Sequence, residues 1–290
     1  MPEPVRRDQP LDVQHDTDPA QDHGIARRIP HLGHALLFLF LTIACFVLWL
    51  VILAVVYRHE MMGAAMQPKI YVAAASQALG YLMALAVAIP IFPLLWQYSF
   101  FTGISWTWRQ ARLHWWKLLL VGFALSGFAQ LSEHIVKAPK GTEIIELFRN
   151  PVAAWLTSCF GGVLVPIFEE IAFRGFLLPA FAIAYDWLSL ERTPAARQRW
   201  QQTTTITRGA WIFSAVLTSI LFVSLHGSQL HWAYGALAVL FVPSLVFCYI
   251  RVRYQSVAAA SLVHIAYDSL IFFEIFVSTG AFRHLDKLAG

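Results

Sequence analysis

The stretch IFEEIAFRGF, residues 167–176, places three ionisable side chains inside a strongly apolar run. Glu170 and Arg174 are four residues apart, so on a helix their side chains share a face and can form an ion pair. Glu169 points about 100° away from Glu170 on the helix and has Phe173, not a basic residue, four positions on. One glutamate is therefore expected to be paired, which leaves Glu169 available for acid–base chemistry. The alternative is a purely structural ion pair beside a carboxylate that reaches the membrane surface.

Two further apolar segments carry polar side chains. His226 ends the run SILFVSLH, with Phe222 four residues before it, and His264 precedes Asp268 by four residues in HIAYD. A lone histidine in an apolar helix is most often a hydrogen-bonded core residue, but three segments that each contribute ionisable groups make a usable acid–base set. The candidate catalytic residues are Glu169, Glu170, His226, His264 and Asp268, with Arg174 and Phe222 as supporting residues.

The composition indicates what surrounds these side chains. Hydrophobic residues make up 58% of the chain and charged residues 13%, against about 25% charged in an average soluble domain. The mean hydropathy is +0.58. These values are typical of a multi-span membrane protein. The net charge of +4 suits contact with anionic membrane lipids, and we predict no nucleic-acid partner.

Several apolar segments are long enough to cross a bilayer. Because backbone groups in lipid must be satisfied within the segment, each is expected to be a helix. The fold class predicted is an all-α, polytopic transmembrane helical bundle of about seven spans, with eight possible. The segment at 151–187 is too long for one straight span, so a kink at Pro166 or a division into two spans is expected. The seven spans are placed at 35–57, 70–96, 117–136, 151–187, 206–226, 230–250 and 256–278.

The chain divides into four regions by composition. The first is a disordered tail, rich in proline and acidic residues and without apolar periodicity. The N-terminal transmembrane helices and the catalytic helical core follow, and a short tail ends the chain. The regions are 1–30, 31–136, 137–280 and 281–290.

Lysine and arginine counts predict the orientation in the membrane. With seven spans, thirteen of these residues fall on the side of the N-terminal tail and seven on the other side. Cytoplasmic segments carry the excess of positive charge, so the N-terminus is expected to be cytoplasmic and the protein to be a multi-pass protein of the cell inner (plasma) membrane. With eight spans this bias disappears.

The three motifs together resemble a known family. EEIAFR (169–174) fits the pattern EExxxR, FVSLH (222–226) fits FxxxH, and HIAYD (264–268) fits HxxxN/D. Their order and spacing are similar to those of the CPBP family, the CAAX-protease and bacteriocin-processing (Abi, type II CAAX prenyl endopeptidase-like) membrane proteins. The resemblance covers about 151–270. The chain has Asp268 where the eukaryotic CAAX proteases typically have asparagine, whereas bacterial relatives use either residue.

This resemblance implies an intramembrane glutamic endopeptidase that needs no cofactor and no metal. Glu169 would be the general base that activates a water, helped by His226, while His264 and Asp268 would stabilise the oxyanion. Glu170 and Arg174 would support the site. As a carboxylate Asp268 cannot donate to an oxyanion, so it would have to be protonated or act indirectly by orienting His264, and the second role is the one expected. The expected partners are membrane lipids and a peptide or membrane-protein substrate; no oligomeric state is assigned.

Two other readings remain open. Glu169, His226, His264 and Asp268 could instead bind zinc in a membrane metalloprotease, although the chain has no HExxH motif. The chain could also be a catalytically inactive scaffold or immunity protein. In a bundle of straight spans His226 and Glu169 would lie at different depths, so a tilted helix or the kink at Pro166 must bring them together if the site is real.

Overall fold

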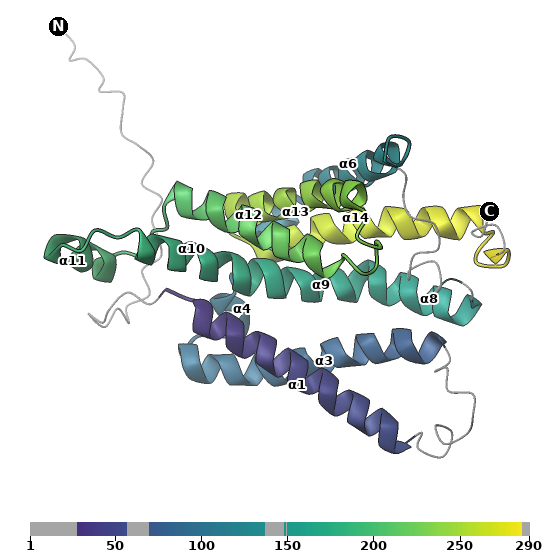
Figure 1. Cartoon of the computed structure of the whole chain (residues 1–290), viewed down its shortest axis with the longest axis horizontal. Helices are drawn as coiled ribbons and strands as arrows, with labels where there is room; N and C mark the ends of the chain where they lie inside the picture. Colours follow the sequence, from purple (N-terminus) through teal and green to yellow (C-terminus); the bar gives the residue numbers. More distant parts are fainter. Residues whose placement is uncertain (1–27, 57–69, 137–147, 149, 286–290) are drawn as a thin grey trace, which may run out of the picture. The chain divides into compact units, whose positions relative to one another are not determined.

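The computed structural model describes the helical part of the chain (Figure 1). Most of the predicted disordered tail, the first part of the predicted catalytic core and the end of the C-terminal tail lie outside it. Every regular element within the described part is a helix. The described residues are 28–56, 70–136, 148 and 150–285.

Six of the described helical segments are long and apolar enough to cross a membrane. This confirms an all-α, polytopic membrane protein. The predicted span at 117–136 is the helix α6, which has 19 residues and does not belong to these six. The six are α1 (Leu32–Val56), α3 (Ile70–Trp96) from Ala75 onward, the segment Pro151–Leu188, α12 (Arg208–Leu225), α13 (Tyr234–Tyr254) and α14 (Val257–Ser278). The other described helices outside Pro151–Leu188 are α4 (Phe100–Gly103), α5 (Trp108–Leu113), α6 (Trp115–Glu133) and α11 (Pro194–Gln202).

The segment Pro151–Leu188 is one continuous helix of 38 residues. Two π-helical stretches, Phe160–Leu164 and Ile171–Leu177, separate its α-helical parts α8 (Pro151–Cys159), α9 (Val165–Glu170) and α10 (Leu178–Leu188). At about 1.5 Å per residue it is roughly 57 Å long, nearly twice the hydrocarbon core of about 30 Å. The helix must therefore tilt or extend beyond the bilayer, and it counts as one span.

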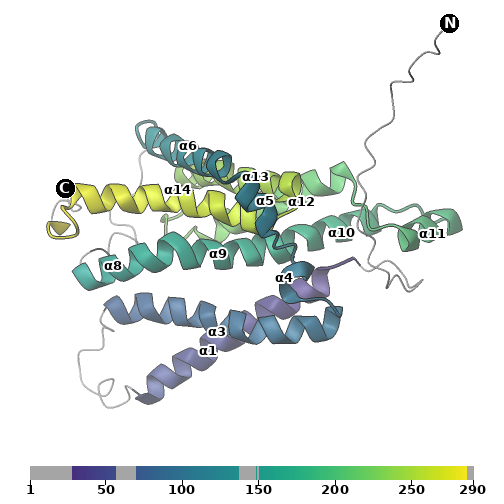
Figure 2. The same cartoon turned by 180° about the vertical axis from the view of Figure 1, so that it is seen from behind.

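This long helix lies at the centre of the fold. Helices α1 and α3 pack against it on one side, and α12 and α14 contact it on the other, as the two opposite views show (Figures 1 and 2). Helix α6 packs along α14. A β-carbon at Gly122 on α6 would collide with the backbone carbonyl of Val263, so glycine permits this close approach.

The chain forms two compact units. The larger unit comprises Arg28–Leu190 and the chain from Thr205 onward. The stretch Glu191–Thr204, which contains α11, belongs to the other. Thr193 caps α11 by accepting a hydrogen bond from the backbone N–H of Ala196.

A polar contact fixes α10 against the start of α12. The carboxylate of Asp186 accepts hydrogen bonds from the backbone N–H of Thr207 at 2.8 Å and from its hydroxyl at 2.5 Å. Glu169 lies 17 residues before Asp186, and His226 lies 19 residues after Thr207. At a rise of about 1.5 Å per residue, these stretches of helix are about 26 and 28 Å long. The two helices therefore return to the same depth, which brings Glu169 and His226 together.

The charge bias predicts the sidedness of this arrangement. In a variant with Cys45, Cys159 and Cys248 replaced by alanine, single cysteines at Ser189 and Thr203 should react with a membrane-impermeant maleimide only from the cytoplasmic side. A cysteine at Ser228, an exposed residue after α12, should react only from the opposite side, because α12 crosses the bilayer between them.

The measurement is labelling of intact cells or spheroplasts against labelling of inverted membrane vesicles. Each variant serves as its own control after solubilisation in detergent, where all three positions should react. Labelling of all three positions from one side would contradict the seven-span topology.

Candidate active site

A fully buried ion pair anchors the site. The side chains of Glu170 and Arg174 are both 0% exposed, and Arg174 Nη1 lies 2.9 Å from Glu170 Oε1. Arg174 Nη2 also donates to the backbone carbonyl of Ser244, at 2.8 Å, and to its hydroxyl, at 2.7 Å. The guanidinium carbon lies 4.9 Å from the centre of the Phe222 ring and 5.2 Å from that of Phe247. Helices α12 and α13 thus surround a charge that the long helix introduces.

The π-helical stretch Ile171–Leu177 follows directly after the two glutamates. Such a stretch changes the regular i→i−4 hydrogen bonding and is common at functional sites. The backbone carbonyl of Arg174, inside this stretch, accepts a hydrogen bond at 3.2 Å from Nε of Arg251, which is itself only 3% exposed. Arg251 therefore supports the backbone that carries the ion pair.

Sequence reasoning missed this contribution of α13. Ser244, Phe247 and Arg251 lie at positions i, i+3 and i+7, so they share one face of the helix. All three are buried and contact the ion pair, its backbone or His264. Polar residues at helical spacing within an apolar span were the available signal.

Glu170 also contacts the histidine of α14. His264 Nδ1 lies 3.0 Å from Glu170 Oε1, the oxygen that Arg174 also contacts. A carboxylate paired with a guanidinium is an acceptor, so His264 donates its Nδ1 proton. The imidazole also stacks on Phe247, with 4.5 Å between the ring centres. This arrangement fixes the ring and directs Nε2 away from the ion pair.

Asp268 is the more distant carboxylate of His264. Its Oδ2 lies 3.6 Å from His264 Nε2, and its side chain is 22% exposed. The sequence suggested that Asp268 orients His264. The structure shows that the shorter contact of the ring is with Glu170, on the opposite nitrogen, whereas Asp268 faces the same side as Glu169.

His226 reaches the site from the end of α12. It caps the C-terminus of this helix, and its Nδ1 lies 2.8 Å from the backbone carbonyl of Phe222. Since a carbonyl only accepts, Nδ1 carries the proton. The Phe222 ring packs against the imidazole at 4.6 Å between centres. Phe222 therefore positions His226 through both its carbonyl and its ring.

Glu169 lies between the two imidazoles. Its Oε1 is 3.9 Å from His226 Nε2 and its Oε2 is 3.8 Å from His264 Nε2, with 16% of its side chain exposed. These separations exceed a direct hydrogen bond and match groups that share a bridging water. The structure thus brings together all the residues predicted from the motifs: Glu169, Glu170, Arg174, Phe222, His226, His264 and Asp268.

The arrangement also bears on metal binding. In their neutral forms both histidines present the unprotonated Nε2 toward Glu169, which is the form that ligates metals. Among the described residues, however, no group of three or more His, Cys, Asp or Glu side chains has an arrangement that could hold a metal ion.

The part of the chain that carries the site is similar to a known family. Residues 150–270 match the family described as Type II CAAX prenyl endopeptidase Rce1-like. This part of the chain is similar to that family. The match confirms the resemblance inferred from the three motifs and supports a membrane endopeptidase, that is, a hydrolase. The comparisons with curated proteins and with solved structures found no match.

The burial of the ion pair predicts how its loss would affect stability. Replacing Glu170 by glutamine leaves the Arg174 guanidinium buried without a counter-charge, and breaking such a pair typically costs about 3–5 kcal/mol. Glu170→Gln should therefore lower the melting temperature in detergent markedly. Glu169→Gln is the matched control, because Glu169 is partly exposed and makes no direct hydrogen bond in the described structure. Equal melting temperatures for the two variants would contradict the anchoring role of Glu170.

Proposed function

We propose that the chain is an intramembrane glutamic endopeptidase in which Glu169 activates the attacking water. One observation carries this proposal: Glu169 is partly exposed and lies between two histidines whose Nε2 atoms both face it. Glu170, by contrast, is fully buried and holds Arg174 and His264. The two adjacent glutamates therefore have different environments, and only Glu169 can reach a water and a substrate.

In the proposed reaction Glu169 takes a proton from water while the oxygen attacks the carbonyl carbon of the scissile bond. The carbonyl π bond opens, and the resulting oxyanion requires donors. His264 can donate from Nε2 only as the imidazolium, since Glu170 already accepts its Nδ1 proton. The oxyanion then re-forms the carbonyl, the C–N bond breaks, and Glu169 passes its proton to the leaving amine, which completes hydrolysis of the peptide bond.

The other two side chains have subordinate roles in this proposal. His226, held by the Phe222 carbonyl, accepts a hydrogen bond from the attacking water through Nε2 and orients it toward the substrate. Asp268 faces His264 Nε2 at 3.6 Å and steadies the imidazolium by its charge. Arg174 touches no substrate; it fixes Glu170, which fixes His264.

The substrate that fits this site is a peptide segment in or at the membrane. The site residues come from the middle of the long helix, from the end of α12 and from the central part of α14, all of them membrane-spanning candidates. The charge bias of the loops supports a protein of the inner membrane with a cytoplasmic N-terminus.

The decisive test is Glu169→Gln. This change keeps the shape of the side chain and removes the base, so cleavage should fall by about 10²–10⁴-fold, toward the upper end for a sole water-activating group. Purified protein in liposomes is incubated with membranes from cells that lack this chain. New peptide N-termini are then quantified by mass spectrometry.

Glu274→Gln provides the matched control, because it makes the same chemical change at an exposed position of α14 outside the site. It should cleave as the wild type does. If Glu169→Gln yields the same new N-termini as the wild type, at equal protein level, Glu169 is not the water-activating base. If the wild type itself yields no new N-termini, the inactive scaffold is preferred.

A zinc-dependent membrane metalloprotease is the second candidate. Two contacts of the imidazoles favour it. The Nδ1 atoms of His226 and His264 each contact a hydrogen-bond acceptor, and both Nε2 atoms face Glu169. Glu169, His226, His264 and Asp268 would then need to move closer together to ligate the ion.

Metal removal distinguishes the two candidates. If Glu169 acts directly on water, treatment with 1,10-phenanthroline followed by desalting should leave the cleavage rate unchanged, and elemental analysis should show less than stoichiometric zinc. Activity that disappears with the chelator and returns with added zinc would establish the metalloprotease instead.

A further inference from the structure

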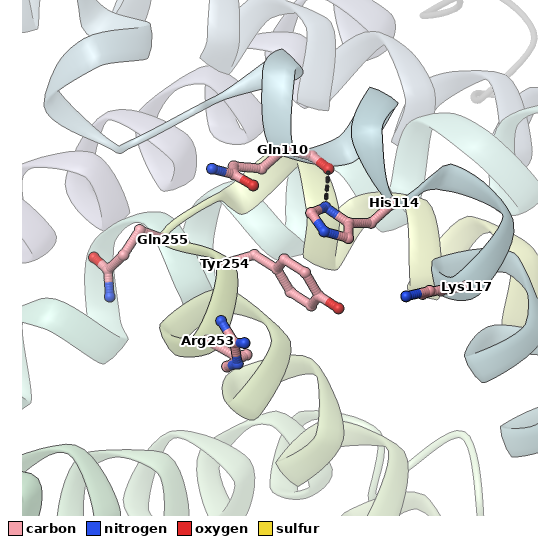
Figure 3. Close-up of a pocket in the computed structure, with 6 residues that line it drawn as sticks. All are labelled: Gln110, His114, Lys117, Arg253, Tyr254 and Gln255. Atoms are coloured by element: carbon pink, nitrogen blue, oxygen red, sulfur yellow. Dashed lines mark hydrogen bonds between the residues drawn. The ribbon is translucent and has the colours of Figure 1, made fainter. Parts of the chain in front are cut away.

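A cavity of about 310 Å³ lies away from the proposed active site, between the α5–α6 junction and the C-terminal end of α13. Figure 3 shows His114 and Tyr254 between Lys117 on one side and Arg253 with Gln255 on the other. A cavity of this size can hold a small polar group such as a phosphate with its ester substituent, but not a whole lipid. Its lining residues are Gln110, His114, Lys117, Arg253, Tyr254 and Gln255.

The lining is cationic. Lys117 and Arg253 are exposed basic residues on different helices, and none of the six lining residues is acidic. His114 Nδ1 lies 3.1 Å from the backbone carbonyl of Gln110, so this nitrogen donates and the ring is held in place. No side chain caps the N-terminus of α6, which begins directly after His114. The positive end of the helix dipole therefore adds to the attraction for an anion.

The surroundings indicate where such an anion comes from. Trp108, Trp115 and Trp116, on the same two helices, are between 50% and 62% exposed. Tryptophans concentrate where the membrane meets water, at the level of the lipid headgroups. Lys117 Nζ lies 5.3 Å from the centre of the Trp116 ring. We therefore expect the cavity to lie at headgroup depth, beside an aromatic surface that faces lipid.

We propose that this cavity binds the phosphate of an anionic glycerophospholipid headgroup. Basic pockets between transmembrane helices on the cytoplasmic side suit such headgroups. Arg253 supplies the planar donor pair that matches two phosphate oxygens, and Lys117 supplies a point charge from the opposite wall. The centre of the Tyr254 ring lies 4.8 Å from that of His114, and both rings line the cavity between Lys117 and Arg253 (Figure 3).

A lipid in this position connects α6 to α13. Hydrogen bonds already join the start of α5 to the turn between α13 and α14: the Thr107 hydroxyl donates to the Gln255 carbonyl at 3.2 Å, and the Ser256 hydroxyl donates to the Thr107 carbonyl at 2.8 Å. A phosphate that binds both Lys117 and Arg253 adds a further link. Because it binds the folded protein only, it should raise thermal stability in proportion to its concentration.

The test compares melting temperatures of the full chain in mixed micelles that contain phosphatidylglycerol or phosphatidylcholine. Each variant is compared with itself in the two lipids, so a general loss of stability does not affect the result. The wild type should be stabilised by phosphatidylglycerol. In Lys117→Ala/Arg253→Ala the apparent affinity for phosphatidylglycerol should fall roughly thirty-fold, since each basic residue near the membrane contributes several-fold.

Arg192→Ala/Arg197→Ala is the matched control, since it removes two positive charges that do not line the cavity. It should retain the stabilisation. Native mass spectrometry should show one retained phosphatidylglycerol molecule in the wild type and none in the alanine pair. Equal loss in both alanine pairs, or equal stabilisation of the wild type by inorganic phosphate alone, would overturn the proposal.

Discussion

The buried ion pair between Glu170 and Arg174 is the constraint on which the rest of the structure depends. Two charges on a membrane-spanning helix carry a desolvation cost that their mutual attraction alone does not offset. The remaining donors and the flat guanidinium face need partners, and these come from other helices: Ser244 and Phe247 on α13, and Phe222 on α12. The ion pair thereby determines which helices must surround the long one.

The same pair separates the roles of two chemically identical neighbours. Glu170 contacts Arg174 and His264 and is fully buried, so a substrate cannot reach it. Glu169, one residue earlier, points to a different face of the helix and remains partly exposed between the two histidines. A helical rotation of about 100° between adjacent residues is enough to produce this difference. An anchored neighbour also holds the backbone of Glu169 in place, which a preorganised site requires.

A contact far from the site also fixes the positions of its residues. The contact between Asp186 and Thr207 sets α10 and α12 in register, and this decides that His226 arrives at the depth of Glu169. The same end of α13 that carries Arg251 also carries Arg253 and Tyr254, which line the basic cavity. The helix that supports the ion pair therefore also contributes to the cavity proposed to bind a lipid headgroup.

The sequence by itself determined the composition of the site and the class of fold. Hydropathy shows membrane helices because the bilayer requires about 20 apolar residues and internal hydrogen bonds. The spacing of Glu170 and Arg174 predicts their pairing because residues four apart are neighbours on any helix. Both arguments are local, and both agree with the structure. The choice of Glu169, Glu170, His226, His264 and Asp268 rested on the same local patterns.

Only the tertiary structure decided which partner each group has. The sequence placed His264 beside Asp268 on one helix, but the shorter contact is with Glu170 on another. The roles of Ser244, Phe247 and Arg251 and the single continuous helix through Pro166 were likewise not evident from local spacing. Contacts between helices depend on tilt, depth and rotation, which arise from the packing of all the spans together. A pattern within one helix contains no information about them.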